Sequence, residues 1–369
     1  MRPPRAGLAA AAVAVGLVAA CTSSPPAPDR TALPVRPQWR AVTLPAPPGP
    51  AGRLTPRAAT FCGDRWYVVG GVAAPTGDTR PAVWSTTDPG AAQGWESLPI
   101  EATDYYAVRS VLYSVSCKDG LVGAIGARSG GAHGNPRTRN FYERPDHTFV
   151  GVTSTDFTLF AGEDAVSVDR IAAGPKGFLL AGNRVSGAAV WLSPDAHAFE
   201  IVEGAPGLAS DAALQTNATD AVAVDDGWLV AGSARKPDRI DRDTFAWSSP
   251  DGRTWTRVPL PTTTDDEVAQ RLVRAGDGML ALGTAADGFA AWRGDASGAS
   301  GWRAGTRFGS AGPGAVAGVE SVAVLPDSGR VLAATTAAEG HRLWSGDLDG
   351  QRWRPVDLPA RAAPPRPCY

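Results

Sequence analysis

The feature that most constrains this chain of 369 residues is a unit of sequence that recurs along most of its length. The clearest copy spans 226–260. It contains a turn, a short apolar strand that ends in Gly, a second strand that ends at Trp247, a tight turn at 250–252, and a last strand that carries Trp255. Short apolar strands separated by Gly- and Pro-containing turns, with no long amphipathic helical pattern, indicate an all-β fold.

Weaker copies precede and follow this unit, and we count six in all. The Gly-based landmarks recur every ~45–55 residues, and such a period with about four short strands per copy is typical of a β-propeller blade. A single blade cannot bury its own faces, whereas a closed ring of blades can. We therefore predict an all-β, six-bladed β-propeller, with seven blades as the alternative if one degenerate copy is merged with its neighbour. The apolar second strands of the six units lie at 66–71, 120–126, 177–182, 226–232, 277–283 and 330–334.

Two segments depart from the regular unit. In the second copy, a long insertion over 128–147 is expected to delay the third strand to 149–152. Before the first copy, 39–45 resembles the last strand of a unit, as at 255–261 and 353–359. We expect this opening strand to lie beside the last or first blade and to help close the ring, and we assign 38–369 to one propeller domain.

The first twenty residues look like a targeting segment. Arg2 and Arg5 precede an apolar run over 6–20 that is too short to span a bilayer. The run ends in Ala-Ala-Cys21, which resembles a bacterial lipobox and implies that Cys21 is lipidated. The alternative is an ordinary secretory signal that is cut near Ala20. With a Pro- and Ser-rich tether at 21–37, this predicts a protein held by lipid on the extracytoplasmic face of the cell membrane.

Charge and composition exclude several classes of protein. The formal net charge is −2, and removal of Arg2 and Arg5 with the leader brings it to −4, so nothing indicates a nucleic-acid partner. No phosphate-binding Gly-rich loop, GxSxG motif or CxxC pair is present, and we predict no cofactor. The spacing of His133 and His147 matches no strong metal motif, so no metal is predicted either. A monomer is expected.

The turn at 249–255 resembles the Asp-box of sialidase-type (BNR-repeat) propellers, although it is one residue short. Weaker partial matches occur at 193–195 and 345–347. The role of such a turn is structural: Asp251 accepts backbone N–H groups, Gly252 takes a positive φ, and Trp255 packs under the turn.

The resemblance also implies a catalytic site, which in that family consists of three arginines, a Tyr–Glu nucleophile pair and an Asp that acts as the acid. Glu101, Asp104, Tyr105 and Tyr106 lie together between the first two units, but the family's Arg-Ile-Pro segment is absent and no arginine can be matched to the triad. We therefore favour a binding or scaffold module for a protein or glycan, and leave enzymatic activity unassigned. The alternative is a sialidase-like glycoside hydrolase, which needs two placed carboxylates.

The candidate binding residues lie on long loops. His133, Asn135 and Arg137 of the insertion supply donors, and Tyr105 and Tyr106 could form aromatic walls. The loops after each second strand share one face with the linkers between blades, so these residues and the charged loop at 235–243 should lie on the same side of the ring. The plainer alternative is that the insertion is ordered by its own side chains.

The cysteines suggest a cross-link. Cys62 and Cys117 occupy matching positions before the turns of neighbouring units, and an exported chain permits a disulfide. We predict a Cys62–Cys117 bond, with Cys368 pairing to one of them as the alternative.

Overall fold

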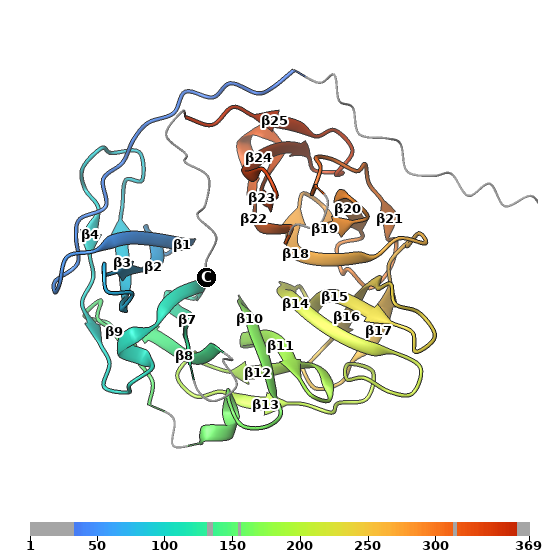
Figure 1. Cartoon of the computed structure of the whole chain (residues 1–369), viewed down its shortest axis with the longest axis horizontal. Coiled ribbons are helices and arrows are strands. Elements are labelled where there is room, and N and C mark those ends of the chain that lie inside the picture. The colour runs from blue at the N-terminus through green and yellow to red at the C-terminus, as the bar shows by residue number, and fades with distance from the viewer. Residues whose placement is uncertain (1–32, 131–135, 154–155, 313–315, 360–369) are drawn as a thin grey trace, which may run out of the picture.

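Six sheets, five of four antiparallel strands and one with a fifth strand added, surround a central axis, as the blades of a propeller do (Figure 1). The computed structural model describes residues 33–130, 136–153, 156–312 and 316–359. The only helices in these ranges are three short 3-10 turns, η1 (Ala107–Arg109), η2 (Phe157–Leu159) and η3 (Pro326–Ser328). The prediction of an all-β propeller with six blades is confirmed.

Strands follow one another from the axis to the rim in every blade. Blade 2 has an extra strand, β5 (Ile100–Glu101), which pairs in parallel with β9 at its rim. The first three blades consist of β1 (Arg53–Cys62), β2 (Arg65–Ala73), β3 (Thr79–Thr86) and β4 (Glu96–Ser97); β6 (Val111–Lys118), β7 (Leu121–Ser129), β8 (Pro136–Glu143) and β9 (Phe149–Gly151); and β10 (Ala165–Gly174), β11 (Gly177–Arg184), β12 (Gly187–Ser193) and β13 (Glu200–Val202). The last three consist of β14 (Gln215–Val224), β15 (Gly227–Arg235), β16 (Asp243–Ser249) and β17 (Thr256–Pro259); β18 (Glu267–Ala275), β19 (Gly278–Ala285), β20 (Gly288–Gly294) and β21 (Arg303–Ala304); and β22 (Gly318–Leu325), β23 (Arg330–Ala337), β24 (Gly340–Asp347) and β25 (Arg354–Val356).

Blade 2 corrects the expected position of its third strand. The segment treated as an insertion contains β8, which is the third strand, and 149–151 is the fourth. This strand was missed because it carries Phe141 where the other blades carry Trp, and the polar Asn140 beside it where they carry Val, Ala or Leu. Asn140 is buried, and its amide donates to the main-chain oxygens of Ala196 and His197 in blade 3, at 2.9 and 3.0 Å. A polar side chain can occupy the core here because the neighbouring blade satisfies it.

Repeated tryptophans join three of the blades to the chain segment that precedes each of them. The indole N–H groups of Trp84, Trp191 and Trp292, all on third strands, donate to the main-chain oxygens of Pro45, Leu159 and Pro261, at 2.7 to 3.0 Å. All three rings are buried. The same bond therefore anchors the linkers into three blades, and a buried donor of this kind is costly to leave unpaired.

The opening segment closes the ring, as predicted, but not as a strand. Val35 forms a parallel bridge with Val356 of β25, and the Trp39 indole donates to the main-chain oxygen of Asp357 at 2.7 Å. The segment then crosses to blade 1, where Pro45 accepts the Trp84 bond (Figure 1). Within the described residues, 36–47 form no strand. The likeness of 39–45 to 255–261 reflects the shared Leu-Pro anchor.

The turn at 249–255 has the bonding expected from its sequence. Asp251 Oδ1 accepts the backbone N–H groups of Arg253 and Thr254, at 2.8 and 2.7 Å. Gly252 takes a φ of +77° and the Trp255 indole donates back to its carbonyl at 3.1 Å. These hydrogen bonds hold the pKa of the Asp251 carboxyl at about 2. The predicted roles of Asp251 and Gly252 are confirmed. In each of the other five blades an Asp at the corresponding turn also accepts a backbone N–H: Asp88, Asp146, Asp195, Asp295 and Asp347.

Replacing Asp251 by Ala is expected to lower the free energy of unfolding by about 1–2 kcal/mol, because two backbone N–H groups lose their charged acceptor. Asp251→Asn keeps a side-chain oxygen and should lose less. Urea unfolding at neutral pH measures both variants. An unchanged free energy of unfolding in Asp251→Ala would show that the carboxylate hydrogen bonds do not stabilise the turn.

A disulfide joins blades 1 and 2 near the axis. Cys62 and Cys117 end or nearly end the first strands of the two blades, and their Cα atoms lie 5.5 Å apart. This separation is within the range that a disulfide can bridge.

Candidate functional site

The structure describes three of the five residues chosen from the sequence as ligand contacts: Arg137, Tyr105 and Tyr106. His133 and Asn135 fall outside the described residues. The Arg137 guanidinium lies over the Phe157 ring, 5.3 Å from its centroid, and its Nε is buried without a hydrogen-bond partner among the described residues. Tyr105 packs edge-on against Tyr106 at 5.2 Å. Neither tyrosine nor Arg137 lines the two cavities described below.

Arginines also hold the two tyrosines. Arg109 lies over the Tyr105 ring at 4.1 Å, and Arg139 lies over Tyr106 while it pairs with Asp104 at 2.8 Å. The structure therefore places Tyr105 and Tyr106 in a cluster with Arg109 and Arg139 rather than with Arg137.

A cavity lies on the axis of the ring, apart from the cluster of Tyr105 and Tyr106. Every first strand contains a register shift, and the extra residue in each is a β-bulge. Bulges re-aim side chains and are common beside functional sites. Each bulge residue lies five positions before the end of its strand, which puts six different side chains at equivalent places: Arg57, Tyr113, Asp169, Thr219, Gln270 and Glu320.

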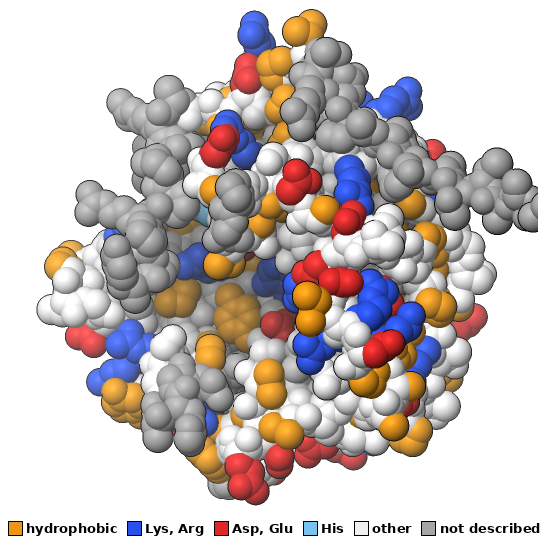
Figure 2. All heavy atoms as spheres, turned by 45° about the vertical axis from the view of Figure 1, so that its right-hand side comes forward, with side chains coloured by type: hydrophobic (Ala, Val, Ile, Leu, Met, Phe, Trp, Pro, Cys, Tyr) orange, Lys and Arg blue, Asp and Glu red, His pale blue; other side chains and the backbone are white. Residues whose placement is uncertain are grey.

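The last five of these bulge residues line a single cavity of about 420 Å³, together with Arg170 and Arg271. We call this cavity the axial channel. Its walls come from the first strands of blades 2 to 6, so it lies at the centre of the ring. Figure 2 shows a hollow near the middle of the molecule in which hydrophobic and basic side chains are visible.

Two arginines bring positive charge into the axial channel. Arg170 donates to the main-chain oxygens of Tyr113 and Glu320, at 3.1 and 3.0 Å, and Arg271 Nε donates to the same Glu320 oxygen at 2.9 Å. Within the described part of the chain, neither guanidinium has a carboxylate oxygen within 4.0 Å. Burial and, second, the nearby charge of Arg170 lower the pKa of Arg271 to about 10, so it remains charged at neutral pH.

Three acids lie in or behind the walls of the channel: Glu320, Asp169 and Asp220. Asp169 accepts from Ser167 Oγ at 2.8 Å and from Asn183 Nδ2 at 3.2 Å, and burial raises the pKa of its carboxyl to about 6. Asp220 is buried and accepts the backbone N–H of Leu272 in blade 5 at 2.9 Å, and burial raises the pKa of this carboxyl as well. Asp169 and Asp220 accept hydrogen bonds from neighbouring donors, whereas the two arginines donate to main-chain oxygens, although the charges of Asp169, Asp220 and Glu320 act on Arg271. The channel can therefore accept an anion.

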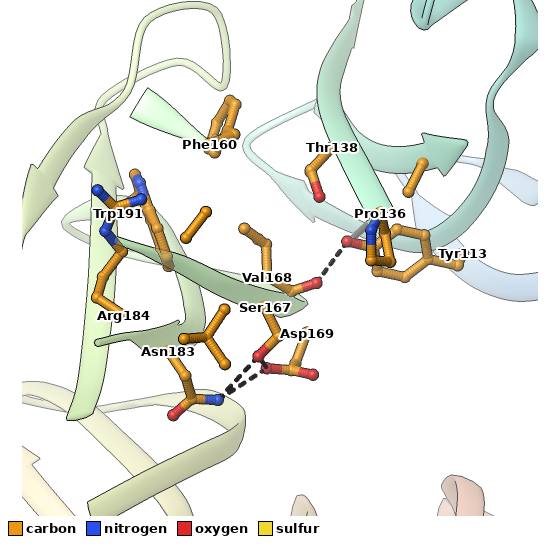
Figure 3. A pocket seen from close by; sticks show the side chains of 13 residues that line it. Tyr113, Pro136, Thr138, Phe160, Ser167, Val168, Asp169, Asn183, Arg184 and Trp191 are labelled. Carbon is orange, nitrogen blue, oxygen red and sulfur yellow. Dashed lines mark hydrogen bonds between the residues drawn. The ribbon is translucent and has the colours of Figure 1, made fainter. Parts of the chain in front are cut away.

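A second cavity of about 240 Å³ adjoins the channel between blades 2 and 3 (Figure 3). We call it the side pocket. It shares Tyr113, Val168 and Asp169 with the channel, and the Tyr113 hydroxyl donates to the main-chain oxygen of Val168 at 2.5 Å. Phe160 and Trp191, whose ring centroids are 6.0 Å apart, form its far wall.

Sequence reasoning missed the residues of both cavities. One signal was present: when the units are aligned on the turn after the first strand, the six bulge residues fall into one column. In five of the six units that column holds a polar or charged side chain, and in the sixth a tyrosine. Arg170 and Arg271 each follow a residue of this column directly.

The pKa of Asp169 leads to a prediction about stability. Its folded-state pKa lies above the value of about 3.9 expected in the unfolded chain, so its contribution to stability is fully present below that pH and is lost as the pH rises through about 6. Asp169→Asn should therefore be more stable than wild type at pH 7.5, and the difference should vanish near pH 4. Thermal unfolding across this range checks it, and a variant that is less stable at pH 7.5 would show that the ionised carboxyl stabilises the fold.

The described residues contain neither a metal-binding cluster nor a membrane-spanning helix. In those ranges no group of three His, Cys, Asp or Glu side chains is placed to hold a metal ion. The described helices also include none that is long and apolar enough to cross a membrane.

Comparison with known proteins shows the fold only. No protein-family model matches the sequence, and no curated protein sequence matches it either. Among solved structures, the chain is similar to a periplasmic gluconolactonase of Pseudomonas aeruginosa, with 13% identity and a TM-score of 0.52 over 82% of this chain and 86% of that one. It is also similar to a protein from Lactobacillus plantarum, with 9% identity and a TM-score of 0.51 over 80% and 81%. A Trypanosoma rangeli sialidase gives 10% identity and a TM-score of 0.45, over 81% of this chain and 53% of that one.

Proposed function

We propose that this chain is a lipid-anchored, extracytoplasmic β-propeller that binds a small anionic ligand in its axial channel. The observation that carries the proposal is the pair Arg170 and Arg271, which line one cavity and lack a carboxylate partner among the described residues. Both guanidinium groups donate to the Glu320 carbonyl oxygen, so a bound anion would meet two fixed donors. Hydrogen bonds between a guanidinium and an anion are roughly twice as strong as neutral ones.

The direct test is calorimetric titration of the full-length protein in detergent with acetate, sulfate and phosphate at low salt. We expect at least one of these anions to bind in a one-to-one ratio, with an affinity that falls as salt is added. Absence of binding by all three would contradict the proposal.

The proposed cellular location rests on the leader. Residues 1–20 would be removed as a lipoprotein signal, 21–37 would act as a tether, and 38–369 would be the propeller domain. Cys21→Ala is expected to move the protein from the membrane fraction to the soluble exported fraction, because acyl chains would hold the wild type at the bilayer. Detergent phase separation measures this, and unchanged partitioning of the variant would contradict lipid anchoring.

A glycoside hydrolase is the second candidate, and one observation favours it. Asp169, whose carboxyl pKa is raised to about 6, and Glu320 line the same cavity as the two arginines. A carboxyl with a raised pKa keeps its proton to a higher pH than an ordinary Asp, which suits a general acid. Turnover of fluorogenic sialosides or other glycosides that is abolished in Asp169→Asn would favour hydrolysis, whereas ligand binding without turnover would favour the binding module.

A further inference from the structure

We infer that the side pocket between blades 2 and 3 is a second subsite of the axial channel, and that it holds an apolar ring or chain attached to the anionic group. The inference rests on the proposed function, because the anion is assigned to Arg170 and Arg271. It adds the chemical class of the ligand: an amphipathic carboxylate, or a phosphate or sulfate ester of similar shape.

The two cavities share three lining residues, Tyr113, Val168 and Asp169, and Tyr113 makes contacts toward both. Tyr113 lines both, its hydroxyl is held by the Val168 carbonyl, and its own carbonyl accepts from Arg170 at 3.1 Å. Figure 3 shows Tyr113 and Val168 side by side at the boundary of the pocket. A ligand anchored by Arg170 therefore lies next to the wall that leads into the side pocket.

The side pocket offers apolar surface because its polar groups are already used. Arg184 donates to Glu203 at 2.7 Å and to the Ala161 carbonyl at 3.1 Å. The Trp191 indole donates to the Leu159 carbonyl, and the Asn183 amide donates to the Ala218 carbonyl at 2.8 Å. A ligand hydroxyl buried here would compete for these partners or lose its own hydrogen bonds, at a cost of about 1–3 kcal/mol. An apolar group meets no such cost.

The shape of the side pocket also suits a ring. Phe160, Trp191 and Tyr113 present aromatic surface, and Val166 and Val168 add aliphatic surface. Its volume of about 240 Å³ exceeds the roughly 150 Å³ of an apolar cavity that binds benzene. One six-membered ring with a short linker therefore fits. Burial of a ring of this size is worth several-fold to a hundredfold in affinity.

The test compares matched pairs of carboxylates that differ in one phenyl group: acetate with phenylacetate, propionate with 3-phenylpropionate, and butyrate with 4-phenylbutyrate. We expect the phenyl member of at least one pair to bind at least tenfold more tightly to wild-type protein by calorimetry. Equal affinities within all three pairs, with acetate still bound, would overturn the inference and leave the anion site standing. If no member of either series binds, the proposed function itself fails.

A cavity-filling variant tests whether the extra affinity of the phenyl compounds arises in the side pocket. Ala127 lines the side pocket and lies outside the axial channel, so Ala127→Leu should remove the phenyl gain and leave the affinity for butyrate unchanged. Ala299→Leu adds the same side chain on an exposed loop and serves as the control. Retention of the full phenyl gain in folded Ala127→Leu would overturn the assignment. If that variant does not fold, saturation-transfer NMR on wild type decides: phenyl protons that receive no more saturation than the linker protons would overturn it.

Discussion

Replacing Arg170 and Arg271 together by Gln is expected to lower the affinity for the bound anion at least a hundredfold. Each guanidinium can supply a charged hydrogen bond worth about 1.5–3 kcal/mol, which corresponds to roughly tenfold or more per residue. Gln keeps a donor for the Glu320 carbonyl, so the fold should survive. Calorimetric titration with the anion that binds wild type most tightly measures the loss.

The matched control is Arg235→Gln. Arg235 ends β15 and lies outside the axial channel, where it donates to Gln215. The variant removes one positive charge without touching the channel, so it separates a general loss of potential from the loss of the channel contacts. If Arg235→Gln weakens binding as much as the double variant does, the anion does not sit between Arg170 and Arg271.

Replacing both Cys62 and Cys117 by Ala is expected to lower the free energy of unfolding by about 2–4 kcal/mol. The bond closes a loop across a sequence separation of 55 residues. In the chain-entropy model such a loop is worth about 4 kcal/mol, and removal of a native disulfide from small secreted domains costs a similar amount. Urea unfolding of the protein, with and without reductant, measures the effect.

Cys368→Ser separates this account from the alternative pairing. It should leave both the stability and the response to reductant unchanged, because the Cys62–Cys117 bond stays intact. Non-reducing peptide mapping should recover Cys62 and Cys117 in one cross-linked peptide. A Cys368 cross-link, or a loss of stability in Cys368→Ser equal to that of the double Ala variant, would contradict the assignment.

Sequence features within single blades predicted most of the architecture. The Gly-ended second strands and the Trp residues mark the blades because each blade repeats the same hairpins and the same packing. The opening segment shares a Leu-Pro pair with 260–261, and in the structure Pro45 accepts the Trp84 bond as Pro261 accepts the Trp292 bond. These features depend on neighbours within one blade or its linker, so a single sequence contains them.

The candidate site depends on contacts between blades, and for this reason it could not be predicted. Arg170 and Arg271 are 101 positions apart and meet only where the ring closes on its axis. The bulges that re-aim their neighbours leave no distinctive residue type, since the six bulge residues share no chemistry. Likewise β8 was hidden because Asn140 is satisfied by carbonyls of blade 3, which a single unit does not reveal.

The measurement that tests the axial site most directly is an anomalous difference map from crystals of the protein soaked in selenate, which replaces sulfate as the anion. The account predicts a selenium peak in the axial channel within hydrogen-bond distance of the Arg170 and Arg271 guanidinium groups, and its loss in the Arg170→Gln/Arg271→Gln variant. A peak only elsewhere on the ring, or an undiminished channel peak in the double variant, would contradict the assignment of the anion to these two arginines.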